Sequence, residues 1–122
     1  MKIAVPVDEN VANTGVCISF GRAPYFLVYD TETKDSNFVE NTAANSPGGA
    51  GIKAAQMIVN SKAEVLLTPR CGENAAEVIK AGSIKMFKTA DGSAMDNINA
   101  YVDGKLAELG EVHPGFHGHA NK

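Results

Sequence analysis

The sequence predicts an α/β domain in which a five-stranded mixed sheet is flanked by about three helices, on one face or on both. Short apolar and β-branched runs, typical of buried strands, are interspersed with longer segments of helical periodicity. The first three runs are joined by loops alone, whereas the last two each follow a helical segment. This order predicts an antiparallel meander followed by parallel crossovers, because parallel strands need a long connection.

The antiparallel part is expected at the start of the chain. Residues 2–7 are apolar and β-branched, and Pro6 limits where this strand can pair. Residues 25–29 and 37–40 follow as strands on either side of the polar turn 31–35, so we expect an antiparallel hairpin there.

Helices and strands alternate in the remainder of the domain. The expected elements are a helix over 52–61, a strand over 63–67, a helix from Glu73 to Gly82, a strand over 83–87 and a helix from Ser93 to Gly104. Asp96 follows Ser93 at the spacing of a capping box. Periodicity fades after Lys105, so we expect one domain over 1–109 and a flexible, histidine-containing tail over 110–122.

Charge and composition exclude several classes of partner. The net charge of −3 and the pI near 5.5 disfavour a nucleic-acid partner or an anionic membrane, which both require an excess of clustered basic residues. No apolar run is long enough for a signal peptide or a membrane span, which predicts a cytoplasmic protein. The two cysteines lie far apart without a Cys-x-x-Cys pattern, so free thiols are expected.

Cys71 is the strongest candidate for a functional side chain. It lies between the strand 63–67 and the helix that begins at Glu73, and such junctions form the ligand-binding edge of open α/β sheets. We expect the helix N-terminus and the adjacent Arg70 to favour the thiolate, which is a soft-metal ligand or a nucleophile. The alternative is a semi-buried residue that only fits behind Gly72.

Three other features are weaker candidates. Backbone N–H groups of the loop that contains Gly48, Gly49 and Gly51 could bind an anion at a helix start, although a flexible turn explains the loop equally well. Arg22 precedes a strand and either points into the same crevice or is simply solvated. We interpret Cys17 as a buried hydrophobic residue that matters only if the fold brings it near Cys71.

The histidines all lie in the tail. His113, His117 and His119 fall within seven residues and could bind copper, nickel or zinc weakly, although a solvated tail is the favoured interpretation. A hydrolytic triad would lack a positioned base, and Asp8 has no evident carboxylate partner for a metal-dependent nuclease. We therefore expect a protein that is not an enzyme; catalysis through Cys71 is the least favoured alternative, because no base is adjacent.

Four segments of the chain together resemble a known family. They are Met1-Lys2-Ile3-Ala4-Val5-Pro6-Val7-Asp8, Phe20-Gly21-Arg22-Ala23-Pro24-Tyr25-Phe26-Leu27-Val28-Tyr29-Asp30, Gly49-Ala50-Gly51 with Ala54-Ala55-Gln56, and Cys71-Gly72-Glu73-Asn74-Ala75. In this order and spacing they resemble the dinitrogenase iron-molybdenum cofactor biosynthesis family, which includes NifX and the C-terminal domain of NifB. The resemblance extends from Met1 to about Leu106.

The resemblance implies a ribonuclease H-like fold and a non-catalytic role. Family members hold or transfer a preformed anionic metal-sulfur cluster, often containing molybdenum, and partner proteins deliver or receive it. This small acidic chain is most similar to members that carry a molybdenum-copper sulfide cluster without covalent attachment. The implied cofactor-binding residues are Arg22, Gly48, Gly49, Gly51, Arg70, Cys71, Gly72 and Asn74, with Cys71 as the candidate metal ligand.

One position departs from the family pattern. Family members commonly have histidine immediately before Phe-Gly-Arg, whereas this chain has Ser19. If that histidine contacts iron, its absence disfavours the iron-molybdenum cofactor and favours a different cluster, or one held by charge and hydrogen bonds. The alternative function is a regulatory protein-protein interaction module of the same fold that holds no cluster.

Overall fold

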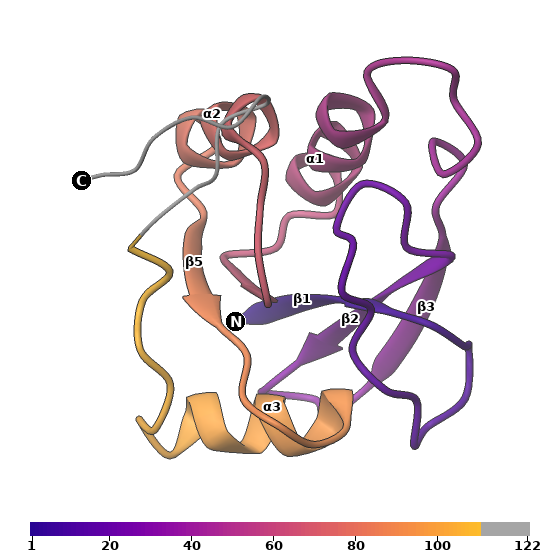
Figure 1. Ribbon diagram of the computed structural model, residues 1–122. Helices are drawn as coiled ribbons and strands as arrows, with labels where there is room; N and C mark the ends of the chain where they lie inside the picture. The colour runs from indigo at the N-terminus through magenta and orange to yellow at the C-terminus, as the bar shows by residue number, and fades with distance from the viewer. Residues whose placement is uncertain (111–122) are drawn as a thin grey trace.

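The computed structural model describes residues 1–110, which form one sheet with helices packed against it (Figure 1). The elements are β1 (Lys2–Val7), β2 (Tyr25–Asp30), β3 (Ser36–Glu40), α1 (Ala50–Asn60), β4 (Val65–Thr68), α2 (Glu73–Ala81), β5 (Lys85–Lys88) and α3 (Ala94–Val102). The sequence predicts this order, with boundaries that differ by a residue or two. Within the described residues, no helix is long and apolar enough to cross a membrane.

The sheet is mixed, as expected, with the strand order β3-β2-β1-β4-β5. Strand β2 pairs antiparallel with both β1 and β3, and β4 pairs parallel with both β1 and β5. The antiparallel meander therefore comes first in the chain and the parallel crossovers follow.

Pro6 interrupts the pairing of β1 on one side. Strand β2 pairs with β1 along its whole length, whereas β4 pairs only with Ile3 and Ala4. Beyond Ala4, the Pro6 carbonyl accepts a hydrogen bond from the Cys17 N–H at 2.8 Å. Proline has no N–H to continue a ladder on that side. The loop after β1 therefore pairs with β1 where β4 no longer does, and it lies between the carboxyl ends of β1 and β4.

Helices cover both faces of the sheet, which settles a question that the sequence leaves open. Figure 1 shows α1 and α2 on one side and α3 on the other. One apolar cluster lies beneath α1 and α2, and a second joins α3 to the opposite face of β1 and β4. Small side chains such as Ala54 and Ala76 are fully buried in the first cluster, which lets α1 and α2 pack closely.

The predicted cap of α3 is confirmed. Ser93 Oγ accepts a hydrogen bond from the Asp96 N–H at 3.0 Å, and the Asp96 carboxylate accepts one from the Ser93 N–H at 3.1 Å. These two bonds are the reciprocal pair of a capping box.

The end of the described chain adds pairing that the sequence did not predict. Lys88 donates its N–H to the Ala107 carbonyl, and Leu109 donates its N–H to the Met86 carbonyl, both at 2.9 Å. Leu109 also packs against the first apolar cluster. Residues 107–109 thus cover the outer edge of β5, which would otherwise expose unpaired backbone groups. The boundary at 109 stays a prediction, and 111–122 lie outside the described residues.

Candidate functional site

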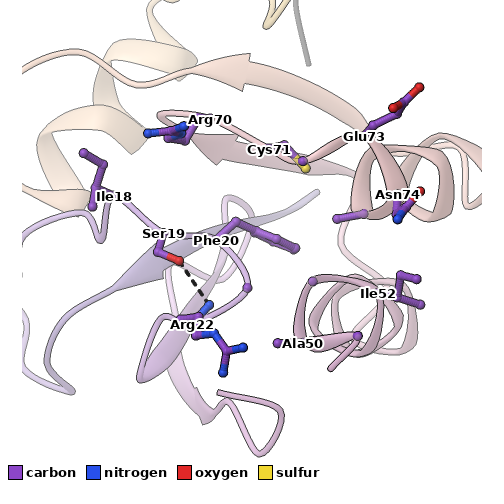
Figure 2. Close-up of a pocket in the computed structure, with 15 residues that line it drawn as sticks. Ile18, Ser19, Phe20, Arg22, Ala50, Ile52, Arg70, Cys71, Glu73 and Asn74 are labelled. Carbon is purple, nitrogen blue, oxygen red and sulfur yellow. Dashed lines mark hydrogen bonds between the residues drawn. The ribbon is translucent and has the colours of Figure 1, made fainter. Parts of the chain in front are cut away.

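A pocket of about 630 Å³ opens at the carboxyl ends of β1 and β4. It is lined by three segments that are distant in the sequence: 18–22 from the β1–β2 loop, 49–52 at the start of α1, and 70–75 at the start of α2. Strand β1 leads away toward β2 and β4 leads to α2, so the connections diverge here. Open α/β sheets bind ligands at such switch points. Figure 2 shows the side chains that face this space.

The first turns of two helices converge on the pocket. Gly49 is the N-cap of α1 and Gly72 is the N-cap of α2, and neither helix has a side-chain cap among the described residues. By contrast, α3 is capped by Ser93. The N–H groups of a first turn have no acceptor within their own helix, and the helix dipole adds positive potential there. Both helix starts can therefore donate hydrogen bonds to an anion in the pocket.

Gly49 is needed for its backbone conformation. Its φ of 71° is in the left-handed region, which side chains with a Cβ rarely adopt. Gly51 is in the first turn of α1, and a Cβ there would lie 3.5 Å from Ala75 Cβ. Gly48, which the sequence analysis included among the binding residues, is exposed and is not among the described residues that line the pocket.

The two arginines of the chain both line this one pocket. Arg22 and Arg70 are exposed, and neither forms an ion pair with a carboxylate within residues 1–110. Arg22 Nη1 donates hydrogen bonds to the carbonyls of Ala44 at 2.7 Å and Ser46 at 3.0 Å. In Figure 2 both arginine side chains point away from Cys71. Two positive charges that form no ion pair among residues 1–110 thus lie at the rim, and Glu73, which also lines the pocket, adds one negative charge.

Cys71 lines the pocket, but its proton is held more tightly than expected. Its side chain is 1 % exposed and belongs to the apolar cluster under α1 and α2. Burial raises the pKa of the Cys71 thiol from 9.0 to about 11, and the positive charge of Lys80 opposes this only in part. The expectation of a readily formed thiolate is therefore wrong, because desolvation of the charged form outweighs the nearby positive charge.

Cys17 does not share the pocket with Cys71. It is a half-buried free thiol packed against the same apolar cluster, and it is absent from the described lining. Burial and the neighbouring Asp8 raise its pKa. Within residues 1–110 there is no group of three or more histidine, cysteine, aspartate or glutamate side chains suited to a metal ion. His113, His117 and His119 lie outside the described residues.

Ser19, at the position where the family resemblance implies a histidine, lines the pocket from the β1–β2 loop, away from Cys71 (Figure 2). Its Oγ accepts a hydrogen bond from the Arg22 N–H at 3.3 Å. In the same turn, a Cβ on Gly21 would come within 3.0 Å of the Gly51 backbone. Glycine at position 21 therefore lets the 18–22 loop lie directly against the first turn of α1.

Sequence reasoning missed three residues at or near this site. Ile18 and Ile52 flank the pocket, and their side chains are 67 % and 42 % exposed. A lone exposed isoleucine leaves no signal in the sequence. Asn41 is buried behind the 18–22 loop, and its Oδ1 accepts the Ala43 N–H at 3.0 Å. Asparagine at the end of a strand is a frequent signal of this Asx turn, so the pattern could have been noticed.

The model of the dinitrogenase iron-molybdenum cofactor family matches residues 1–104. The chain belongs to this family. The resemblance inferred from the sequence motifs is therefore confirmed, and the match covers every segment that lines the pocket.

Three relatives support the assignment. The apo form of the orange protein from Desulfovibrio gigas superposes with a TM-score of 0.85 at 31 % identity, covering 89 % of this chain and 92 % of that one. The NMR structure of a proposed NifB protein from Thermotoga gives a TM-score of 0.82 at 33 % identity, with 94 % and 98 % covered. An uncharacterized protein of Methanocaldococcus jannaschii is 31 % identical over 112 residues, with 89 % and 92 % covered.

Proposed function

We propose that this family member binds and carries a preformed anionic metal-sulfur cluster in the pocket between α1 and α2. The observation that carries the proposal is that both arginines of the chain converge on one cavity with two helix starts that have no side-chain cap among residues 1–110. An inorganic polyanion can accept hydrogen bonds from several directions at once. The pocket offers donors from three separate segments, which suits such a cargo.

Charge and hydrogen bonds are the principal means of holding the cargo in this proposal. Hydrogen bonds that involve a charged group are worth about 1.5–3 kcal/mol each, so each contact from the two arginines and the two helix starts contributes to the affinity. Cys71 is the candidate soft-metal ligand. Its neutral thiol must lose a proton before it can bind a metal, so coordination by Cys71 is coupled to pH.

The finer parts of the proposal come from the family resemblance. The cargo is a molybdenum-containing cluster, of the molybdenum-copper sulfide type, and Ser19 in place of histidine favours it over the iron-molybdenum cofactor. The protein acts in the cytoplasm as a non-catalytic carrier that exchanges the cluster with protein partners. The strand order β3-β2-β1-β4-β5 supports the ribonuclease H-like fold class. The proposed binding residues are Arg22, Gly49, Gly51, Arg70, Cys71, Gly72 and Asn74.

The test is an optical titration. Tetrathiomolybdate and Cu(I) are added to the purified protein, and bound cluster is followed by visible absorption and by molybdenum and copper analysis after gel filtration. We expect a coloured protein that elutes with both metals. The Arg70→Gln variant should bind about tenfold or more weakly, since one charge-assisted contact is lost. A wild-type protein that stays colourless and free of metal would refute the proposal.

Matched variants separate local charge from net charge. Lys85 and Lys105 are exposed and lie outside the pocket, so the pair Lys85→Gln with Lys105→Gln changes the net charge as much as Arg22→Gln with Arg70→Gln. Only the arginine pair should weaken binding strongly. Equal losses in the two double variants would show that long-range attraction, and not the pocket, controls affinity.

A second candidate function is a regulatory protein-protein interaction module without a cluster. The observation that favours it is the exposure of Ile18 and Ile52 on the two sides of the pocket. Exposed apolar side chains that lie close together and are bordered by polar groups are typical of protein-protein contacts. Binding to a defined partner that persists in Cys71→Ala protein after metal removal would support this function, whereas loss of partner binding on metal removal would support the carrier.

A further inference from the structure

Asn41 holds the backbone on both sides of Arg22. Its Nδ2 group donates hydrogen bonds to the Gly21 carbonyl at 3.0 Å and to the Ala23 carbonyl at 2.9 Å, while its Oδ1 accepts the Ala43 N–H at 3.0 Å. The side chain is buried, with 4 % exposed. Two carbonyl acceptors and one N–H donor fix the orientation of the amide, because only its nitrogen can donate.

Arg22 returns contacts to the same segment. Its guanidinium binds the carbonyls of Ala44 and Ser46, which follow Asn41 in the chain. Asn41 thus holds the backbone around Arg22, and the loop after Asn41 holds the Arg22 guanidinium group. Side chain and backbone together connect the 18–22 wall of the pocket to 41–46, a segment that does not line the pocket itself.

The position of this wall matters for the opposite side of the pocket as well. Gly21 lies so close to Gly51 that a Cβ would reach the Gly51 backbone at 3.0 Å. A shift of the 18–22 loop would therefore change both the place of the Arg22 charge and the gap to the first turn of α1. A displacement of about 1 Å is enough to weaken preorganised contacts with a ligand.

We propose that Asn41 is a positioning residue for the anionic cargo, which sets the place of Arg22 and of the 18–22 wall without touching the ligand. This inference rests on the proposed function of the pocket. A flexible cationic side chain must be ordered when the anion binds, whereas a fixed one is already in place. Asn41 therefore contributes to the binding affinity although it lies behind the pocket.

The chain contains a matched control. Asn97 is 1 % exposed and also makes three hydrogen bonds, from its Nδ2 group to the Ala90 and Ser93 carbonyls and to its Oδ1 from the Ala90 N–H. It lies in α3, on the opposite face of the sheet from α1 and α2. Asn41→Ala and Asn97→Ala therefore remove the same chemical group and the same number of bonds at two places.

The affinity test uses tetrathiomolybdate with Cu(I) as the probe and urea unfolding as the measure of stability. We expect both variants to lose stability to a similar degree. Asn41→Ala should bind the probe at least about tenfold more weakly than the wild type, and Asn97→Ala should stay within about twofold. Equal affinities for Asn41→Ala and wild-type protein would overturn the inference.

Two further measurements separate this inference from the proposed function. Amide hydrogen exchange without any probe should accelerate at Arg22 and Ala43 in Asn41→Ala but not in Asn97→Ala. Unchanged exchange at these two amides would overturn the inference even if the wild type bound no probe and the carrier function had failed. If Asn41→Ala does not fold, the ¹⁵N spectrum of the wild type decides. Adding the probe should shift the side-chain amide of Asn41 and leave that of Asn97 unchanged, and an unshifted Asn41 amide would contradict the inference.

Discussion

The buried thiol of Cys71 should make the stability of the protein fall at alkaline pH. Its pKa is 9.0 when exposed and about 11 in the folded protein, and the side chain is 1 % exposed. A folded-state pKa above the unfolded value means that the unfolded chain releases the proton first as the pH rises. The contribution of Cys71 is therefore fully present below pH 9 and is lost as the pH rises through 11.

The size of the effect follows from the two pKa values. A difference of one pKa unit corresponds to about 1.4 kcal/mol, so the change from 9.0 to about 11 corresponds to about 3 kcal/mol. That is a large part of the stability of a typical domain. Cys71→Ala leaves every other ionisable group in place, so the prediction concerns the difference in stability between the wild type and Cys71→Ala and not the wild type alone.

The assay is urea unfolding followed by far-ultraviolet circular dichroism at pH 7.5, 9.0 and 10.5. At pH 7.5 Cys71→Ala should be less stable than the wild type, because it leaves a space in the apolar cluster. The difference should narrow by roughly 2 kcal/mol by pH 10.5, since the wild type loses stability that the variant does not have. A stability difference that stays constant over this range would refute the reasoning and show that the thiol is not desolvated.

Three further predictions follow from the site and its surroundings. Gly21→Ala should cost about 1–3 kcal/mol of stability, because the new Cβ would lie 3.0 Å from the Gly51 backbone. The control Gly48→Ala, whose Cβ would have nothing within 4 Å, should change the stability by less than about 0.5 kcal/mol. Similar losses of stability for the two variants in chemical denaturation would contradict this prediction. Ser93→Ala should cost about 1 kcal/mol in the same experiment and leave cluster binding unaltered, since it removes only the cap of α3; weaker binding of the probe would contradict this. If Cys71 coordinates the cargo, affinity should rise about tenfold per pH unit from pH 7 to 9 and Cys71→Ser should abolish the slope, whereas a flat wild-type profile would show binding by charge alone.

Much of the fold could be read from local patterns. The capping box of Ser93 and Asp96 involves residues three apart, and the structure confirms it. The element order and the mixed sheet also follow from periodicity and connection length, and both are confirmed. The pairing of 107–109 with β5 could not be predicted, because it consists of backbone hydrogen bonds between two segments about twenty residues apart. Such bonds leave no pattern of side chains in the sequence.

The site was predicted less completely. The junction that contains Cys71, the Arg22 turn and the start of α1 were each identified from the sequence, and the structure brings them to one pocket. Their detailed roles depend on distant contacts. Arg22 binds carbonyls 22 and 24 residues away, and Asn41 binds carbonyls 20 and 18 residues away, so neither partner could be read from neighbouring residues.

The sequence by itself determined the order of strands and helices and the family, because periodicity, capping and motif spacing depend on residues near one another in the chain. Only the tertiary structure decided how tightly Cys71 holds its proton, which residues fix Arg22, and that two helix starts open on one cavity. Those properties arise from atoms that folding brings together from separate segments, and desolvation depends on all of them at once.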